Sequence, residues 1–191
     1  LMNLDLTEEQ KLVQDTARDF ARSELEPVAA ELDRGNDGSF YDNLKKLAEL
    51  GFMGLNIKDQ YGGTEAGVIA FSVAMTEIAR VCASTAVTVS VSNMVNEVIQ
   101  ALGSAEQKNR YIAKICSGEY LAGAFALTEP GAGSDPAAMT TTAVRDGDEW
   151  VLNGSKIFIT SGSFAGVFVV WAVTDPKAKK GKGISLFLVE A

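Results

Sequence analysis

The first 120 residues carry hydrophobic positions at intervals of three and four, the spacing of one buried helical face. Thr7 and Gln10 form a capping-box pattern just before the first such run, which predicts that a helix begins there. Pro27 has no backbone N–H, so it is expected to kink or end this helix. The buried stripe predicted for the helix comprises Val13, Ala17, Phe20, Ala21 and Leu25.

The same spacing predicts four more helices in this part of the chain. Gly51 and Gly103 directly follow two of the runs, where a glycine commonly ends a helix. Ser104 and Gln107 form a second capping box. Residues 58–63 are dense in turn-forming residues and are predicted to be a loop. The four helices are predicted at 41–50, 68–81, 88–102 and 104–115.

From about residue 121 the pattern changes to short runs rich in valine, isoleucine, phenylalanine and tryptophan, which favours β-strands. Two dipeptides, Asp146-Gly147 and Asn153-Gly154, favour tight hairpin turns. Strands are predicted at 121–127, 140–145, 150–152, 156–160, 167–173 and 184–190.

This switch of pattern divides the chain into two predicted domains. Residues 1–120 are expected to form an all-α helical domain and residues 121–191 a β-domain, so the fold class is α+β multidomain. Ala191 follows directly after a predicted strand, and about 70 residues make a small β-domain for a self-sufficient core. We therefore expect this β-domain to be incomplete, through truncation or a missing partner segment.

The composition is that of a globular protein and argues against several kinds of site. Hydrophobic residues make up 47% and charged residues 22%, and the formal net charge is −8. Binding nucleic acid requires clustered Lys and Arg, whereas the one basic cluster, at 177–182, is interpreted as an exposed loop. Without histidine, Ser-His-Asp and Cys-His systems and the commonest metal ligand are excluded. Cys82 and Cys116 lack the spacing of a zinc or redox pair, so no metal is expected.

Sequence features also suggest a cellular location. No apolar run approaches the roughly 20 residues that span a bilayer, so no membrane association is expected. The acidic N-terminal region is unlike a signal peptide. Two isolated cysteines fit a reducing compartment. We expect a cytoplasmic protein, or a mitochondrial matrix protein if the source is eukaryotic.

The segment with the clearest chemical character is 125–135, Phe-Ala-Leu-Thr-Glu-Pro-Gly-Ala-Gly-Ser-Asp. Its glycines let a ligand approach the backbone, and Thr128 and Ser134 offer hydroxyls, which suits a pyrophosphate or the edge of a heterocycle. It has neither the Gly-Lys-Ser/Thr of a Walker A motif nor the βαβ setting of a Rossmann fingerprint. The alternative is an ordinary β-turn with Pro130 at its second position, which composition alone favours.

The stretch 126–138 resembles the signature of the acyl-CoA dehydrogenase family, which reads small residue, aliphatic residue, Ser/Thr, Glu, two variable residues, small residue, Gly, Ser/Thr and Asp. The stretch 153–160, Asn-Gly-Ser-Lys-Ile-Phe-Ile-Thr, is similar to the second flavin segment of that family. Further matches at 50–52, 61–64 and 103–108 keep the family order, so the resemblance covers the whole chain. It implies an N-terminal helical bundle and a barrel- or sandwich-like middle β-domain, truncated before a C-terminal helical bundle.

The resemblance implies that these two segments bind FAD. Thr128 would lie near the pyrimidine side of the flavin, and Thr160 would donate toward its N5 region. Gly133 and Ser134 would approach the phosphate-bearing tail, and Ser134 would also meet the pantetheine or phosphate portion of the substrate. Phe158 replaces a tryptophan of many relatives, which keeps an aromatic platform but loses the indole N–H. The implied cofactor-binding residues are Phe125, Leu127, Thr128, Gly133, Ser134, Phe158, Ile159 and Thr160.

The activity implied is α,β-desaturation of an acyl-CoA thioester, in which a carboxylate removes the α-proton and the β-hydrogen leaves as hydride to flavin N5. Electrons would pass to an electron-transferring flavoprotein, and the full-length enzyme would be a homotetramer. The family's base lies in its C-terminal domain, so no catalytic residue is expected in this chain and the 191 residues are not expected to be competent alone. The alternatives are an acyl-CoA oxidase or flavin monooxygenase of the same fold, a non-catalytic scaffold, and an isolated folding module.

A few other residues carry structural expectations. Trp150 and Trp171 are interpreted as core residues, and Glu129 as a loop-structuring residue rather than an acid or base. Glu77 is either a buried, paired charge or, as we prefer, part of a solvated edge. Small side chains within 87–99 are expected to line the acyl pocket and to favour a short or compact acyl group. These small side chains are Ser90, Ser92 and Asn93.

Overall fold

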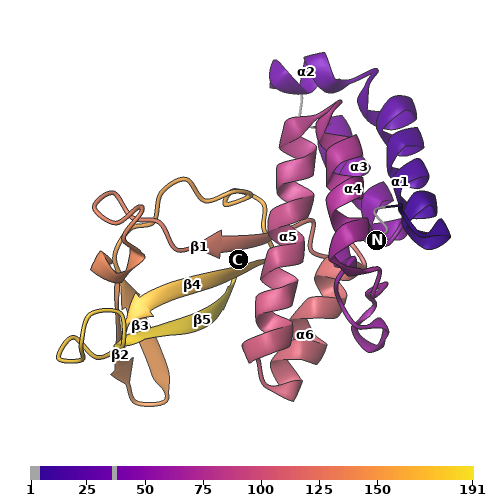
Figure 1. Ribbon diagram of the computed structural model, residues 1–191. Helices are drawn as coiled ribbons and strands as arrows, with labels where there is room; N and C mark the ends of the chain where they lie inside the picture. The colour runs from indigo at the N-terminus through magenta and orange to yellow at the C-terminus, as the bar shows by residue number, and fades with distance from the viewer. Residues whose placement is uncertain (1–4, 36–37) are drawn as a thin grey trace. The chain divides into compact units, whose positions relative to one another are not determined.

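The structure, a computed structural model, describes residues 5–35 and 38–191 (Figure 1). The chain separates into two units, Leu1–Ala122 and Gly123–Ala191. The first is built from helices and the second around one sheet, so the predicted change from helix to strand is confirmed. Within the described residues, no helix is both long and apolar enough to cross a membrane.

The first helix begins at the predicted capping box. The Thr7 hydroxyl accepts from the backbone N–H of Gln10 at 3.2 Å, and the Gln10 side chain accepts from the backbone N–H of Thr7 at 3.0 Å. Helix α1 spans Glu8–Phe20 and continues as a π-helical turn, Ala21–Leu25, that ends two residues before Pro27. The buried members of the predicted stripe are Ala17, Phe20, Ala21 and Leu25.

The four other predicted helices occur in the predicted order, with starts that differ, and the short helix α2 (Ala29–Asp33) is one that was not predicted. Helix α5 begins at Ala83 rather than residue 88, because the extended backbone of Cys82 already serves as its N-cap. Gly51, two residues after the end of α3, adopts a φ of +80°, the left-handed geometry expected of a glycine there. The remaining helices are α2 (Ala29–Asp33), α3 (Gly38–Glu49), α4 (Gly67–Ala79), α5 (Ala83–Leu102) and α6 (Ala105–Cys116), with 3-10 turns at Phe52–Gly54 and Asp59–Tyr61.

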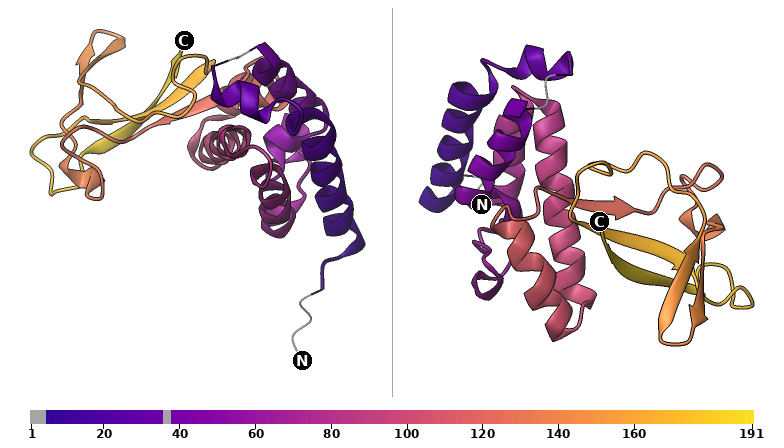
Figure 2. Two further views of the ribbon diagram at one scale, coloured as in Figure 1. Left: turned by 90° about the horizontal axis from the view of Figure 1, so that it is seen from above. Right: turned by 180° about the vertical axis from the view of Figure 1, so that it is seen from behind.

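Helix α4 packs against both α1 and α5, and α5 also packs against α6 (Figures 1 and 2). Helix α5 also has polar residues that hydrogen-bond to the 3-10 turn following α3. Asn93 accepts from the N–H of Leu55 at 2.9 Å and donates to the carbonyl of Phe52 at 2.8 Å. This amide and Ser92 are buried in the helical core, and the expectation that small side chains of 87–99 line an acyl pocket stays a prediction.

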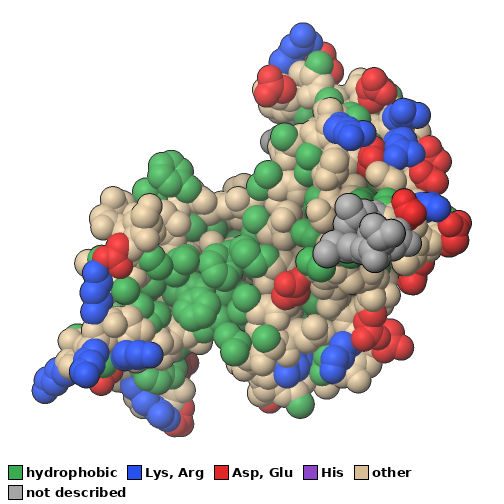
Figure 3. All heavy atoms as spheres, in the orientation of Figure 1, with side chains coloured by type: hydrophobic (Ala, Val, Ile, Leu, Met, Phe, Trp, Pro, Cys, Tyr) green, Lys and Arg blue, Asp and Glu red, His purple; other side chains and the backbone are tan. Residues whose placement is uncertain are grey.

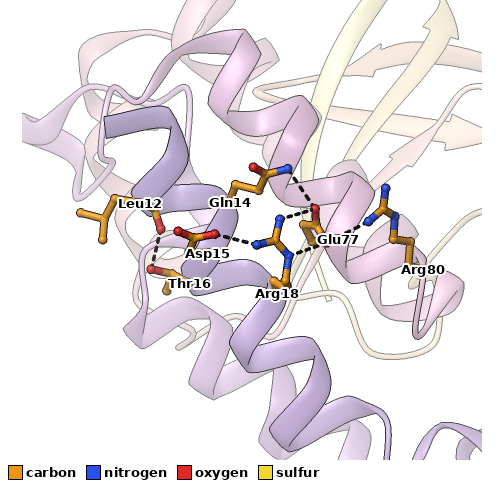
Figure 4. Close-up of polar contacts among 7 residues, drawn as sticks. All are labelled: Leu12, Gln14, Asp15, Thr16, Arg18, Glu77 and Arg80. Atoms are coloured by element: carbon orange, nitrogen blue, oxygen red, sulfur yellow. Dashed lines mark hydrogen bonds and ion pairs between the residues drawn. The ribbon is translucent and has the colours of Figure 1, made fainter. Parts of the chain in front are cut away.

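Glu77 of α4 is buried and paired, which corrects our preference for a solvated edge. Only 4% of its side chain is exposed, and Arg18 of α1 donates to it at 3.0 Å and 3.3 Å (Figure 4). Gln14 donates at 2.9 Å and Arg80 at 3.4 Å. The hydrogen bond from Arg18 holds the pKa of Glu77 below its usual range, although burial alone would raise it.

The second unit contains a five-stranded mixed sheet. Strand β4 is central: it pairs in parallel with β1, antiparallel with β5, and in parallel with β2 at Thr142 and Val173. Strands β2 and β3 form the hairpin predicted around Gly147, whose φ is +60°. The strands are β1 (Gly123–Ala126), β2 (Thr142–Asp146), β3 (Glu149–Asn153), β4 (Val167–Val173) and β5 (Ile184–Glu190).

Three predictions within this unit are wrong. Residues 156–160 are a loop rather than a strand, because Ile157 bonds to the carbonyl of Thr128 and not to a neighbouring strand. Asn153-Gly154 forms no hairpin, since β3 ends at Asn153 and leads into this loop. Trp150 is 42% exposed and packs edge-on against Phe187, so it is not a core residue.

Candidate functional site

Strand β1 leads directly into a tight turn. Glu129 and Ala132 exchange two backbone hydrogen bonds of 3.1 Å, with Pro130 and Gly131 at the tip. The ordinary β-turn considered from the sequence is therefore the local geometry of this segment. The N–H groups of Glu129 and Ala132 donate within the turn, so they are not free to bind an anion. Donors to an anion must therefore come from neighbouring residues.

Two glycines in this segment border open space. A β-carbon placed on Gly131 or Gly133 would meet no atom within 4 Å, and neither residue has a positive φ. Neither backbone conformation nor packing therefore explains why glycine stands at these positions. Ser134, which follows, is exposed. A surface with bare backbone and a hydroxyl next to it is suited to close approach by a phosphate group.

Lys156 ties the two segments singled out from the sequence to each other. Its ammonium donates to the carbonyl of Leu127 at 3.0 Å and to the carboxylate of Glu129 at 2.8 Å. Next to it, the N–H of Ile157 donates to the carbonyl of Thr128 at 3.0 Å. Residues 127–129 and 156–157, far apart in the sequence, therefore lie side by side.

The carboxylate of Glu129 is fully engaged. One oxygen accepts from the backbone and hydroxyl of Thr140 at 2.6 Å and 2.9 Å, and the other accepts from the Thr141 N–H at 3.0 Å besides Lys156. Burial opposes ionisation of a side chain that is 3% exposed, but these hydrogen bonds outweigh it and hold the pKa of Glu129 far below its usual range. Glu129 is therefore an ionised structural group, unsuited to proton transfer near neutral pH.

The loop after Lys156 presents an exposed aromatic ring on a strained backbone. Phe158 is 88% exposed and has a φ of +57°, and Ser161 has a φ of +62°. Such angles are unfavourable for residues with a β-carbon and commonly occur at functional sites. Ile159 and Thr160, between them, are half-buried.

An apolar cavity lies beside the start of the first segment. Its volume is about 360 Å³. In the view of Figure 3, hydrophobic side chains gather over β1 and β4 of the second unit. The ring of Trp171 is tilted against that of Phe125, with centroids 6.1 Å apart. The lining residues are Phe125, Leu127, Pro136, Ala137, Met139, Trp171, Gly181 and Ile184.

The structure places the eight sequence-predicted residues in three groups. Phe125 and Leu127 line the cavity, and Thr128 joins the second segment through its carbonyl. Gly133 and Ser134 are exposed beyond the turn, and among the described residues no hydrogen bond links them to the second segment. The third group, in the loop after Lys156, comprises Phe158, Ile159 and Thr160.

Sequence reasoning missed three members of this region. Lys156 lies within the second segment, which was predicted to be a strand. Its role becomes visible only in the fold, where its ammonium lies 2.8 Å from the buried carboxylate of Glu129. Met139 and Trp171 reach the cavity from other segments, and no local pattern of residues predicts this. Asp135 forms an ion pair with Lys180 of the exposed basic loop, which ties that loop to the end of the first segment.

The available groups fit a flat cofactor with a phosphate tail better than a metal. The described residues contain no group of three or more His, Cys, Asp or Glu side chains that could hold a metal ion. An exposed aromatic ring, threonine hydroxyls and bare glycine backbone instead suit a heterocycle and a pyrophosphate. FAD combines both features.

Comparison with known proteins gives matches along nearly the whole chain. A family model for the N-terminal domain of acyl-CoA dehydrogenase matches residues 7–119, and one for the middle domain matches residues 124–191. The short-chain specific acyl-CoA dehydrogenase of Clostridium acetobutylicum is 42% identical over 190 residues, which cover 99% of this chain and 49% of that protein.

Solved structures show the same fold. A glutaryl-CoA dehydrogenase of Mycobacterium smegmatis in complex with FADH2 aligns with a TM-score of 0.84 and 33% identity, over 97% of this chain and 46% of that one. A chain from the structural study of the electron transferring flavoprotein of Acidaminococcus fermentans aligns with a TM-score of 0.90 and 38% identity, over 100% of this chain and 50% of that one. The chain thus spans about half the length of these relatives. With both domain models matched in order along its length, the chain belongs to the acyl-CoA dehydrogenase family.

Proposed function

We propose that this chain is the FAD-binding portion of an acyl-CoA dehydrogenase that acts on short-chain acyl-CoA thioesters. The observation that carries the proposal is the hydrogen-bonded contact between residues 127–129 and 156–157. This contact brings together the two segments that carry the candidate flavin-binding residues. The short-chain preference is supported by the relative from Clostridium acetobutylicum, which is described as short-chain specific.

FAD would be held by residues of both segments. Thr128 and Thr160 would supply hydroxyl donors to the flavin ring, and Phe158 would lie against it as an aromatic platform. Gly133 and Ser134 would meet the phosphates, where the backbone is open. Phe125, Leu127 and Ile159 would supply apolar contacts, and Ser134 is also our candidate for contact with the substrate.

The chemistry that FAD supplies in this family is hydride acceptance during α,β-desaturation of an acyl thioester. The residues of this chain would bind and orient the ring and keep water from the apolar side of the site. Glu129 is committed to Lys156 and to two threonines, so it does not serve as the base that removes the α-proton. We place that base outside this chain.

We further propose an electron-transferring flavoprotein as the electron acceptor. The match to a chain from the study of such a flavoprotein supports this choice. A homotetramer and a cytoplasmic or mitochondrial matrix location remain proposals drawn from the family resemblance.

The test is a visible absorption spectrum of the purified full-length protein, recorded before and after anaerobic addition of butyryl-CoA. Flavin bands that bleach on addition are the expected result, because reduction of the flavin removes its visible absorption. If the bands bleach only with a different thioester, the proposed substrate class is wrong but the proposed reaction still holds.

Other outcomes would favour the competing functions. Rapid reoxidation of the reduced flavin by air, without an electron-transferring flavoprotein, would point to an oxidase or monooxygenase. A protein that is colourless and takes up no added FAD would overturn the proposed function and favour a non-catalytic scaffold.

A further inference from the structure

We propose that Lys156 and Glu129 are positioning residues whose ion pair sets the geometry of both cofactor segments before FAD binds. This inference rests on the proposed function and deepens it. Neither side chain is expected to touch the cofactor: they are 10% and 3% exposed, and their polar atoms are engaged within the protein.

The pair acts on the first segment through two separate bonds. Lys156 holds the carbonyl of Leu127 at 3.0 Å, just before Thr128, and Glu129 follows Thr128 directly. The backbone on both sides of Thr128 is therefore fixed by one ammonium group. The carboxylate also anchors this segment to Thr140 and Thr141, which immediately precede β2.

The same ammonium group also fixes the backbone at the start of the loop that carries Phe158. Phe158 comes two residues after Lys156, with Ile157 bonded to Thr128 between them. Phe158 and Ser161 have positive φ values, which are unfavourable for residues with a β-carbon and persist only where surrounding contacts enforce them. On the upstream side, Gly154 packs so closely on Thr141 that an added β-carbon would lie 2.6 Å from its α-carbon.

The charges of the pair matter as well as its shape. A buried carboxylate that accepts hydrogen bonds from an ammonium and two backbone N–H groups stays ionised. Removing the charge of Lys156 or of Glu129 leaves the other charge buried and unpaired. The geometry therefore predicts that loss of either charge displaces both segments together. A flat cofactor held between hydroxyls and an aromatic ring would lose several contacts at once.

The experiment compares FAD affinity of K156M, E129Q and E77Q with that of the wild type, in the full-length protein stripped of its flavin. FAD binding is followed by quenching of flavin fluorescence and by the absorption spectrum of the bound flavin, after circular dichroism has shown that each variant is folded. E77Q is the matched control, because Glu77 is an equally buried, Arg-paired carboxylate in the helical unit.

We expect K156M and E129Q to weaken FAD binding by about tenfold or more and to alter the bound spectrum, whereas E77Q changes the dissociation constant by less than about twofold. If K156M does not fold, E129Q answers the same question, because its amide keeps the shape of the carboxylate. Wild-type affinity and spectrum in the folded variants would overturn the inference, even if their stability falls. A wild-type protein that binds no FAD would instead overturn the proposed function itself.

Discussion

At the scale of single residues, Phe158 has the environment that is hardest to explain by folding alone. Its ring is 88% exposed and its φ is +57°, so the isolated structure gains neither burial nor a relaxed backbone from it. We propose that this ring lies against the flavin, as the resemblance to the family implies. A bound ring would cover this exposed surface, which is why we interpret the strain at Phe158 as functional.

Substitution by alanine should lower stability at Gly154 and FAD affinity at Gly133. In G154A the new β-carbon would lie 2.6 Å from the α-carbon of Thr141, and a φ of +155° disfavours any side chain. We expect G154A to lower the free energy of unfolding by about 2–4 kcal/mol. In G133A the new methyl group meets open space, so stability should stay within about 0.5 kcal/mol while FAD affinity falls.

Urea unfolding and FAD titration of both variants test this contrast. A destabilised G133A would show that this glycine is required by the fold rather than by a ligand. A G154A protein as stable as the wild type would mean that Thr141 moves aside at little cost.

At the scale of elements, α1 and α4 are joined by the buried Glu77 and its arginine partner (Figure 4). Helix α1 is amphipathic and α4 is largely apolar, so a charge on α4 looked out of place in the sequence. The fold makes it favourable, because Gln14 and Arg18 of α1 and Arg80 of α4 converge on one carboxylate. Burial without these partners would instead have raised the pKa of Glu77.

We expect the stability that Glu77 contributes to depend on pH. Because its pKa is lowered in the folded state, its contribution is complete above the unfolded value of about 4.3 and is lost as pH falls below it. At pH 7, E77Q should lower the free energy of unfolding by about 2–3 kcal/mol, allowing for the partial exposure of Arg18. Urea unfolding at several pH values should show the difference from the wild type narrowing below pH 4.3. A constant difference would mean that the charge of Glu77 is not what stabilises the helices.

At the scale of the whole chain, the two units can be followed by different signals. Both tryptophans of the sequence lie in the sheet, on β3 and β4, while all described α-helices lie before residue 123. Tryptophan fluorescence therefore reports on the sheet unit and far-ultraviolet circular dichroism mainly on the helical unit.

Substitutions should consequently affect the two signals differently in the 191-residue chain. We expect E77Q to lower the urea midpoint seen by circular dichroism, and E129Q the midpoint seen by fluorescence, because each removes a buried charge from one unit. If each variant shifts both midpoints equally, the units unfold as one cooperative body.

The sequence by itself determined most of the helices and strands in their order, both capping boxes, the change from helix to strand and the segments that resemble a flavin site. These features depend on local spacing, backbone preferences and short motifs, which a linear sequence carries directly. It misassigned 156–160 as a strand, because its run of isoleucine, phenylalanine and threonine favours a strand but is also compatible with a loop whose conformation is set by contacts with other segments. Only the tertiary structure decided that Lys156 meets Glu129 and that Glu77 meets Arg18. Whether a charge is solvated or buried with a partner depends on contacts between distant segments, and no local pattern specifies them.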